Sequence, residues 1–272
     1  MNSNDKDRRV ALVTGASSGI GEAAARQLLA AGFIVYGTSR RGAASGQRAF
    51  PLLELDVTSD ASVTAAIGAL EHREGRIDLL VNNAGIGVTG AAEESSIEQV
   101  RALFETNFHG VVRVTNAVLP LMRRQGRGRI LNVGSALGFI PAPFSAYYSA
   151  TKHALEGYSE SLDHEVRGFG IRVAVIEPDA TRTSFESATV ASDRPLAAYD
   201  TLRASYLKAY ERAMADAGTP DSVAETIVRA AQDRQPQLRY PSGKSARQGA
   251  FARRFLPRSL FDKALHTQFG LG

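Results

Sequence analysis

Apolar residues along the chain fall into two alternating patterns. Short, continuous apolar runs are typical of strands that are buried on both faces of a sheet. They predict strands at residues 10–14, 34–38, 49–55, 77–81, 129–133, 171–176 and 238–240. Between most of these runs, apolar residues recur at i, i+3 and i+4, which is the spacing of one face of a helix.

The most regular helical pattern covers residues 146–166. Its apolar face consists of Ala150, Ala154, Leu155, Tyr158, Leu162 and Val166. Further helices are predicted from the N-cap Ser59 to about Arg73, from Ile97, and over 111–122 and 221–232. This alternation, without a linker or repeat, predicts a single doubly wound α/β domain of Rossmann type over residues 1–272. We expect about seven strands in a mostly parallel sheet, helices on both faces, and ligands beyond the carboxyl ends of the strands.

Two segments depart from the alternation. From residue 179 to about 218 the pattern loosens into a long connection with a helical piece at 202–214. Because long excursions inside a compact domain are usually functional lids or disordered segments, we expect a substrate lid there. The stretch from about 247 to 272 predicts a carboxyl-terminal helical extension, with Pro257 as a helix start. Its apolar residues are Phe251, Phe255, Leu256, Leu260, Phe261, Leu265 and Phe269.

Composition narrows the class of protein. Of the 272 residues, 44% are hydrophobic and 22% are charged, which is ordinary for a globular domain. The chain has no cysteine, which excludes disulfides and thiolate metal sites, and we expect no bound metal. The first ten residues are polar, and no apolar run approaches the roughly 20 residues that span a bilayer. We therefore expect a cytoplasmic protein without an integral membrane segment.

The charge balance is basic, with a formal net charge of +4 and a sequence pI of about 9.5. Much of the excess lies in the tail, at Arg247, Arg253, Arg254, Arg258 and Lys263. No nucleic-acid-binding motif accompanies these residues. A solvated basic surface is therefore favoured over a nucleic-acid partner.

The first predicted strand runs into a glycine-rich turn that opens a helix. Gly15, Gly19 and Gly21 follow the spacing Gly-x-x-x-Gly-x-Gly, which differs from the commoner Gly-x-Gly-x-x-Gly. Free backbone N–H groups and the helix dipole make such a turn an anion site, and glycines let phosphates approach the backbone. A glycine cluster alone fits a flexible turn equally. Its position between a buried strand and a helix favours a dinucleotide site.

The end of the second predicted strand reads Ser39-Arg40-Arg41. About 20 residues beyond the glycines, an NAD site carries an acid for the ribose 2′-hydroxyl. The next acidic residue after this strand is Glu54. The position expected for the NAD-binding acid holds Arg40 and Arg41 instead, and their guanidinium groups suit a 2′-phosphate. An ordinary basic loop is the alternative, and we predict NADP(H) as the cofactor.

Tyr148 and Lys152 are four residues apart on the predicted 146–166 helix, so they share one face. Because a neighbouring ammonium favours the phenolate, we expect the pKa of Tyr148 to fall below about 10. Such a phenol can exchange a proton with a substrate oxygen near neutral pH, and the Ser135 hydroxyl can bond the same oxygen. Tyr147 is the rival phenol, but it points to another side of the helix. Taken alone, a Tyr–Lys pair at this spacing is usually a stem packed on a ring.

Several motifs occur together in one order. They are the glycine turn at 14–21, Asn82-Asn83-Ala84-Gly85, Asn107, Ser135 and Tyr148-x-x-x-Lys152. Through them the chain strongly resembles the short-chain dehydrogenase/reductase family over about residues 8–183. The resemblance implies a nicotinamide-dependent oxidoreductase whose catalytic set is Asn107, Ser135, Tyr148 and Lys152.

The resemblance also implies a role for each of these residues. Tyr148 is the acid/base, Ser135 orients the substrate oxygen, Lys152 binds the nicotinamide ribose and lowers the Tyr148 pKa, and Asn107 holds a water. Asp56 and Val57 are expected to contact the adenine, and the 82–85 turn is expected to lie on the adenosine side of the cofactor. In the family's Pro-Gly-x-x-x-Thr stretch, Asp179 replaces the glycine. The expected cofactor contacts are Gly15, Ser17, Ser18, Gly19, Ile20, Gly21, Ser39, Arg40, Arg41, Asp56, Val57, Asn83, Ala84, Gly85, Tyr148, Lys152, Pro178 and Thr183.

The implied reaction is hydride transfer between NADP(H) and a carbonyl or secondary alcohol, running towards carbonyl reduction. The expected substrate contacts are Ser135, Leu137 and Tyr148. The apolar residues beside Ser135 fit a pocket wall or the core equally, and they are Leu137, Phe139, Ile140, Pro141 and Phe144. The lid and tail look like the hydroxysteroid-dehydrogenase-like branch, and the family implies a homodimer or homotetramer through 111–122 and 146–166. The alternatives are a non-catalytic NADP-binding sensor and a membrane-peripheral reductase of lipid-like substrates.

Overall fold

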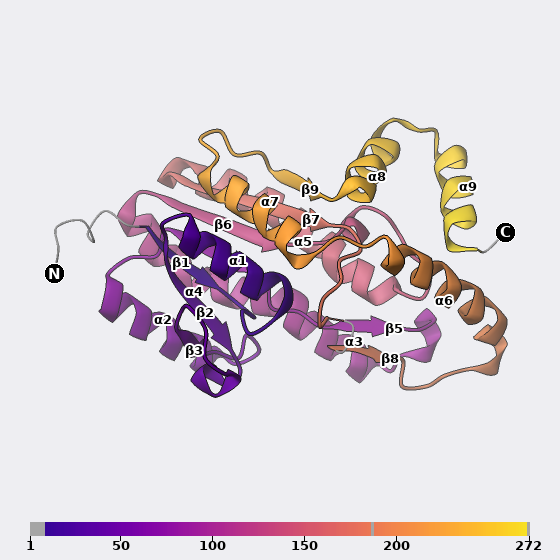
Figure 1. Ribbon diagram of the computed structural model, residues 1–272, viewed down its shortest axis with the longest axis horizontal. Coiled ribbons are helices and arrows are strands. Elements are labelled where there is room, and N and C mark those ends of the chain that lie inside the picture. The colour runs from indigo at the N-terminus through magenta and orange to yellow at the C-terminus, as the bar shows by residue number, and fades with distance from the viewer. Residues whose placement is uncertain (1–8, 186–187, 271–272) are drawn as a thin grey trace.

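A seven-stranded parallel sheet forms the centre of the molecule (Figure 1). The computed structural model describes residues 9–185 and 188–270. The strands lie in the order β3-β2-β1-β4-β6-β7-β9, and each neighbouring pair is parallel. They span β1 Val10–Val13, β2 Ile34–Ser39, β3 Leu52–Glu54, β4 Leu79–Asn82, β6 Gly128–Val133, β7 Ile171–Pro178 and β9 Arg239–Ser242. The predicted doubly wound α/β fold is confirmed.

Helices cover both faces of this sheet. They span α1 Gly19–Ala30, α2 Asp60–Glu74, α3 Ile97–Phe104, α4 Gly110–Gln125, α5 Ala146–Val166, α6 Asp200–Ala215, α7 Pro220–Gln232, α8 Lys244–Phe255 and α9 Arg258–Phe269. Successive residues of a strand point to opposite faces. On β1, Ala11 and Val13 join a core formed with α1 and α7, while Val10 and Leu12 join one formed with α2, α4 and α5.

The strand order reverses between β1 and β4, which are hydrogen-bonded neighbours although two β–α units separate them in sequence. Ligands of open α/β sheets bind at such a reversal, beyond the carboxyl ends of the strands. The glycine turn follows β1 and the 82–85 turn follows β4 there. The sheet topology therefore brings two of the predicted motifs together.

The predicted third strand, 49–55, is shortened to β3. Pro51 has no N–H to donate to a ladder, so pairing of the whole run is interrupted at this residue. Its carbonyl still accepts a hydrogen bond from Gly37 at 3.0 Å.

The 179–218 excursion begins and ends at one point, because Thr181 and Gly218 form a parallel bridge. Within it, β8 (Thr189–Ala191) pairs with β5 (Gly87–Thr89) in a second, two-stranded sheet that the sequence did not predict. The buried carboxylate of Glu94 anchors the excursion by accepting the Leu196 N–H at 2.7 Å and bonding Arg203. Residues 186–187 of the predicted lid lie outside the described residues.

The tail forms two helices, α8 and α9, and Pro257 is the N-cap of α9, close to its predicted place. Figure 1 shows both (yellow) at one end of the molecule, outside the layers that cover the sheet. Phe261 is buried and Phe269 stacks on Tyr206 of α6, with ring centroids 6.4 Å apart. Among the helices that the structure describes, none is long and apolar enough to cross a bilayer.

Candidate active site

The glycine-rich turn forms a cradle at the N-terminus of α1. Gly15 and Gly19 have φ angles of 65° and 59°, which L side chains rarely adopt. A Cβ on Gly21 would lie 2.3 Å from the Gly15 carbonyl oxygen. Only glycine fits these positions, which leaves backbone N–H groups open to an anion.

Thr14 and Asn83 hold this cradle against the turn after β4. The Thr14 hydroxyl accepts the N–H groups of Asn83 and Ala84 at 2.9 and 3.1 Å. The Asn83 amide donates back to the carbonyls of Thr14 and Gly15 at 3.0 and 3.1 Å. The neighbouring Asn82 points inward, donating to Thr115 and Asn132, so its side chain does not face the crevice.

A cavity of about 560 Å³ adjoins the cradle. It is lined by Ser18, Gly19, Arg182, Thr183, Ser184 and Pro220. The Ser184 hydroxyl donates to Ser18 at 2.8 Å, which connects the start of the excursion to the glycine turn. A helix N-terminus and a guanidinium on one cavity fit the phosphates of a dinucleotide. Arg182 was not among the predicted site residues, although its position before Thr183 was a usable signal.

The arginines after β2 lie at the outer end of the crevice. Arg40 and Arg41 are exposed, while Ser39 is buried and its hydroxyl bonds that of Ser45 at 2.6 Å. A third cation, Arg48, donates to the Ser17 carbonyl at 2.7 Å and pairs with Glu22 at 2.9 Å. Sequence reasoning missed Arg48 because only the folded loop brings it back to the glycine turn.

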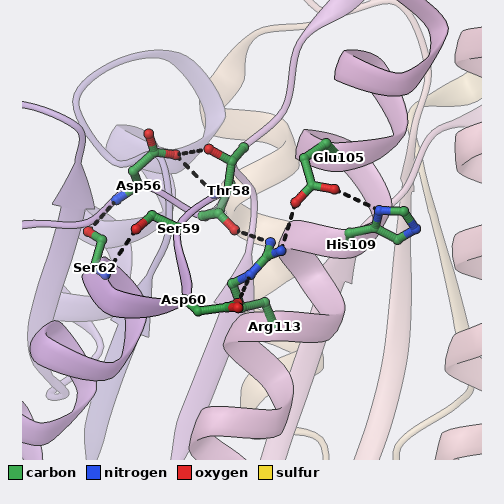
Figure 2. A network of polar contacts seen from close by, with 9 residues as sticks. Asp56, Thr58, Ser59, Asp60, Ser62, Glu105, His109 and Arg113 are labelled. Atoms are coloured by element: carbon green, nitrogen blue, oxygen red, sulfur yellow. Dashed lines mark hydrogen bonds and ion pairs between the residues drawn. The ribbon is translucent and has the colours of Figure 1, made fainter. Parts of the chain in front are cut away.

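The loop after β3 is held by a polar network (Figure 2). The Asp56 carboxylate accepts hydrogen bonds from the backbone N–H and the hydroxyl of Thr58. The pKa of Asp56 is held below its ordinary value, mainly by the backbone hydrogen bond and further by the hydroxyl bond and the charge of Arg40. Arg113 of α4 donates to the Val57 carbonyl and Glu105 carboxylate, both at 2.7 Å, and bonds Asp60. Arg113 therefore ties the expected adenine loop to the segment that carries Asn107.

Asn107 lies on a π-helical turn, Glu105–His109, between α3 and α4. Its side chain is buried, accepts the Ile86 N–H and donates to the Ile86 carbonyl, each at 2.9 Å. It also reaches Thr151 of α5 at 3.4 Å. Wide turns of this kind are frequent at functional sites, and here the turn aims an amide at the strand-end loop and the catalytic helix.

Ser135, Tyr148 and Lys152 come together beyond the ends of β6 and β7. The Ser135 hydroxyl lies close enough to that of Tyr148 to lower the pKa of the phenol. The Lys152 ammonium donates to the Val133 carbonyl at 2.8 Å and lies 5.6 Å from the centre of the Tyr148 ring. The three residues therefore form one cluster, as the sequence predicted, and two hydroxyls are available to one substrate oxygen.

The expected fall in the Tyr148 pKa is wrong for this arrangement. Burial raises the pKa of Tyr148 to about 12, and the nearby Ser135 hydroxyl opposes this rise only in part. The Lys152 amine points to a backbone carbonyl instead of the phenol oxygen, and burial lowers its own pKa to about 8. At neutral pH Tyr148 is thus a protonated phenol, suited to giving a proton to a developing alkoxide.

Behind Lys152 lies a buried acid pair, Glu156 of α5 and Glu177 of β7, which the sequence analysis did not single out. Arg239 donates to Glu156 at 2.9 Å and lies 3.7 Å from Glu177. Burial and the charge of Glu156 raise the pKa of Glu177 to about 8. Because two neighbouring buried carboxyls do not both ionise readily, the pair shares one proton at neutral pH and carries one negative charge beside the lysine.

Apolar side chains lie near Tyr148 and Ser135. The Phe185 ring lies 5.8 Å from that of Tyr148, and Leu137 is half-buried beside Ser135. Phe144 belongs to the core instead, packed on Tyr206 with ring centroids 5.2 Å apart. The apolar run after Ser135 is therefore divided between the core and the crevice.

A glycine cradle, a cavity with a cation and a Ser–Tyr–Lys cluster at one edge of a doubly wound sheet define a nicotinamide-dependent oxidoreductase. Comparison with known proteins agrees with this class. The family model for short chain dehydrogenase matches residues 9–194. The chain belongs to the short-chain dehydrogenase family, and it is an enzyme of the hydride-transferring kind.

Two relatives illustrate the similarity. A 3-ketodihydrosphingosine reductase of Bacteroides thetaiotaomicron is 44% identical over 177 residues, which cover 65% of this chain and 65% of that protein. The match with this relative therefore spans just under two thirds of its length. The mouse 17-beta-hydroxysteroid dehydrogenase type 1 is 38% identical over 254 residues, covering 86% of this chain and 73% of the relative.

Solved structures agree on the fold. A short-chain dehydrogenase from Streptomyces avermitilis superposes with a TM-score of 0.82 at 34% identity, covering 98% of this chain and 99% of that one. A Brucella melitensis 3-ketoacyl-(acyl-carrier-protein) reductase complexed with NADH gives 0.73 at 27% identity, covering 87% and 97%. A serine dehydrogenase complexed with NADP+ gives 0.72 at 28%, covering 85% and 93%. The cofactor is thus a nicotinamide dinucleotide, and the neighbours include both forms.

Proposed function

We propose that this protein is an NADP(H)-dependent reductase of an apolar ketone or aldehyde, with Tyr148 as its acid/base. The observation that carries the proposal is the cluster of Ser135, Tyr148 and the buried Lys152 beyond the ends of β6 and β7. This arrangement sets two hydroxyl groups where one carbonyl oxygen can accept from both.

The residues divide the work as follows. The nicotinamide, when bound, supplies or accepts the hydride. Ser135 and Tyr148 hold the substrate oxygen, stabilise the negative charge that grows on it, and Tyr148 hands over its proton. Lys152 is held by the Val133 carbonyl beside the Tyr148 ring and would bind the ribose, while Asn107 holds the backbone of Ile86 through two hydrogen bonds. Positioning both reactants in one crevice replaces a bimolecular encounter.

The cradle residues Gly15, Gly19 and Gly21 and the cavity at Arg182 would hold the pyrophosphate. Asp56 and Val57 would face the adenine, and Arg40 and Arg41 the 2′-phosphate. The absence of an acid at the end of β2 supports NADP(H) over NAD(H).

The substrate class is proposed from two sources. The Phe185 ring and Leu137 give the crevice an apolar wall beside Tyr148. The names of two relatives specify a 3-ketodihydrosphingosine and a hydroxysteroid, which carry a keto group and a hydroxyl group, respectively, on an apolar body. Segment 179–218 would act as the lid, since its base is closed by the Thr181–Gly218 bridge and it carries Phe185.

The decisive experiment is a spectrophotometric assay of NADPH and NADH oxidation with a panel of apolar ketones, aldehydes and quinones. Turnover above that of a Tyr148→Phe variant supports the reductase. NADPH binding without turnover on any substrate would instead favour a non-catalytic sensor. Cytoplasmic location and a homodimer or homotetramer through α4 and α5 are parts of the same proposal. Fractionation and analytical ultracentrifugation test them.

A further inference from the structure

The two carboxyl-terminal helices leave large apolar side chains in solvent. Phe251 and Phe255 of α8 are 64% and 61% exposed, and their rings lie 4.8 Å apart. Leu256 and Leu260, where α8 gives way to α9, are 42% and 54% exposed. Phe261 is only 4% exposed, so one side of α9 is packed and the other is not. A cluster of this kind on a protein surface marks an interaction site.

The same surface is strongly basic. Between residues 244 and 272 there are six lysines and arginines and a single acid, Asp262, whereas the whole chain carries only +4. The basic residues are Lys244, Arg247, Arg253, Arg254, Arg258 and Lys263, and each is exposed. The rest of the chain is therefore close to neutral.

Cations and rings are interleaved on this surface. The Arg254 guanidinium lies 5.4 Å from the centre of the Phe255 ring, and that of Arg253 lies 5.2 Å from Phe261. Arg258 faces the one acid, Asp262, at 3.9 Å. The apolar groups thus cannot be covered by a partner without bringing that partner close to several unneutralised guanidinium groups.

This charge decides between possible occupants. A second copy seated symmetrically on the patch would bring like charges together across the interface, because a twofold contact pairs a surface with itself. An anionic bilayer matches both components, since phenyl and leucyl groups enter the acyl boundary and arginines meet phosphates. We propose that the exposed face of α8 and α9 docks the enzyme on anionic phospholipid membranes.

Both helices rest on segments that border the catalytic tyrosine. A Cβ on Gly249 of α8 would lie 2.4 Å from Ile140, which follows Ser135 in the chain. Phe269 of α9 stacks on Tyr206 of α6, whose hydroxyl bonds that of Ser145, three residues before Tyr148, at 3.3 Å. Docking would therefore bring the substrate side of the crevice near the bilayer. The docking itself does not depend on what the enzyme reduces.

The first test is co-sedimentation of the full chain with phosphatidylcholine vesicles, with and without phosphatidylglycerol. We expect pelleting only with the anionic vesicles, and release by added salt. Because each cation near an anionic surface strengthens binding about fivefold, Arg253→Gln/Arg254→Gln should weaken it roughly 20- to 30-fold. Phe251→Ser/Phe255→Ser should abolish it.

Matched controls lie near the amino ends of β6 and β7, whereas α8 begins beyond the carboxyl end of β9. Phe169 is 49% exposed, and Arg123 stands over its ring at 5.9 Å, beside Arg124. Phe169→Ser and Arg123→Gln/Arg124→Gln should bind vesicles as the parent does. Unchanged circular dichroism and NADPH-fluorescence binding in each variant show that the fold and the cofactor site are intact.

The second test uses the absence of tryptophan from the chain. Phe255→Trp supplies a single fluorophore, whose emission should shift to shorter wavelength with anionic vesicles and be quenched by brominated lipid. Phe169→Trp should show neither effect. Equal pelleting of all variants, no pelleting, or equal binding to pure phosphatidylcholine overturns the proposal. Conversion of an oligomer to monomers by Phe251→Ser/Phe255→Ser also overturns it, by identifying a second copy as the occupant.

Discussion

The Asp179 carboxylate accepts the backbone N–H of Ser245 at 3.1 Å, in the first turn of α8. Its own N–H donates to the Ser242 carbonyl at 3.0 Å. The intervening Gly243 has a φ of 102°, and a Cβ there would lie 2.0 Å from the carboxylate. The acid that replaces the family's glycine after β7 thus ties the 178–183 stretch to the tail.

Removing this acid should loosen α8. Asp179→Ala leaves a helix N–H without its acceptor and removes a negative charge from the helix N-terminus, at a cost of about 0.5–2 kcal/mol. Thermal unfolding and amide hydrogen exchange of α8 measure the effect. Asp179→Asn keeps an acceptor oxygen and should lose less stability. An equal loss in both variants would mean that the hydrogen bond to Ser245 contributes nothing.

Tyr148→Phe should lower kcat for carbonyl reduction by about 10²- to 10⁴-fold, the usual contribution of a positioned proton donor. NADPH affinity should change little, because the ring and Lys152 stay in place. The matched control is Tyr147→Phe, which removes the neighbouring phenol on the same helix and should leave kcat near that of the parent. Steady-state kinetics of both variants with one substrate measure these effects. Comparable losses of kcat in Tyr148→Phe and Tyr147→Phe would assign the proton to neither residue.

The regular parts of this molecule were predictable from local pattern. The apolar run at 10–14 and the helical spacing at 146–166 gave β1 and α5 to within a residue, because burial on two faces or on one face dictates those patterns. The three-residue strands β5 and β8 are too short for any periodicity, and they pair across about 100 residues.

The candidate site also contains residues that local spacing predicts and residues that it does not. Residue types at fixed spacing predicted the Ser135–Tyr148–Lys152 cluster, since one helix and one strand end place them. Arg48, Arg113 and the acid pair of Glu156 and Glu177 depend on contacts between distant segments, which spacing does not encode. The Tyr148 pKa was mispredicted because helical spacing fixes proximity to Lys152 but gives neither the burial of the phenol nor the direction of the amine.

The buried acid pair predicts a fall in stability as pH rises. The pKa of Glu177 is raised from 4.5 to about 8, so the folded chain binds more protons than the unfolded chain between those values. This contribution to the free energy of unfolding is therefore fully present at about pH 4.5 and below, and it is lost as pH rises through about 8. Above pH 8 the lowered pKa of Lys152 acts in the opposite direction, because the unfolded chain then holds the extra proton.

Glu177→Gln should flatten this dependence, since an amide keeps the shape and has no proton to lose. The midpoint of thermal unfolding, followed from about pH 5 to 8, measures the slope. Glu160→Gln is the control, because Glu160 bonds the same Arg239 at 3.0 Å but is exposed. A slope that is unchanged in Glu177→Gln would contradict the shared proton.

Arg40 and Arg48, two basic residues near the glycine turn, should affect cofactor binding differently. Arg40→Asp removes a charge-assisted hydrogen bond to the 2′-phosphate and adds a repulsive charge, so it should weaken NADPH binding about ten- to hundredfold while NADH binding changes little. Arg48→Gln should weaken both cofactors alike, because Arg48 holds the glycine turn through Ser17 and Glu22. Titration of each variant with both cofactors, followed by their fluorescence, distinguishes these patterns. A preference ratio that is unchanged in Arg40→Asp would show that Arg40 does not recognise the phosphate, and a shift confined to Arg48→Gln would assign that role to Arg48.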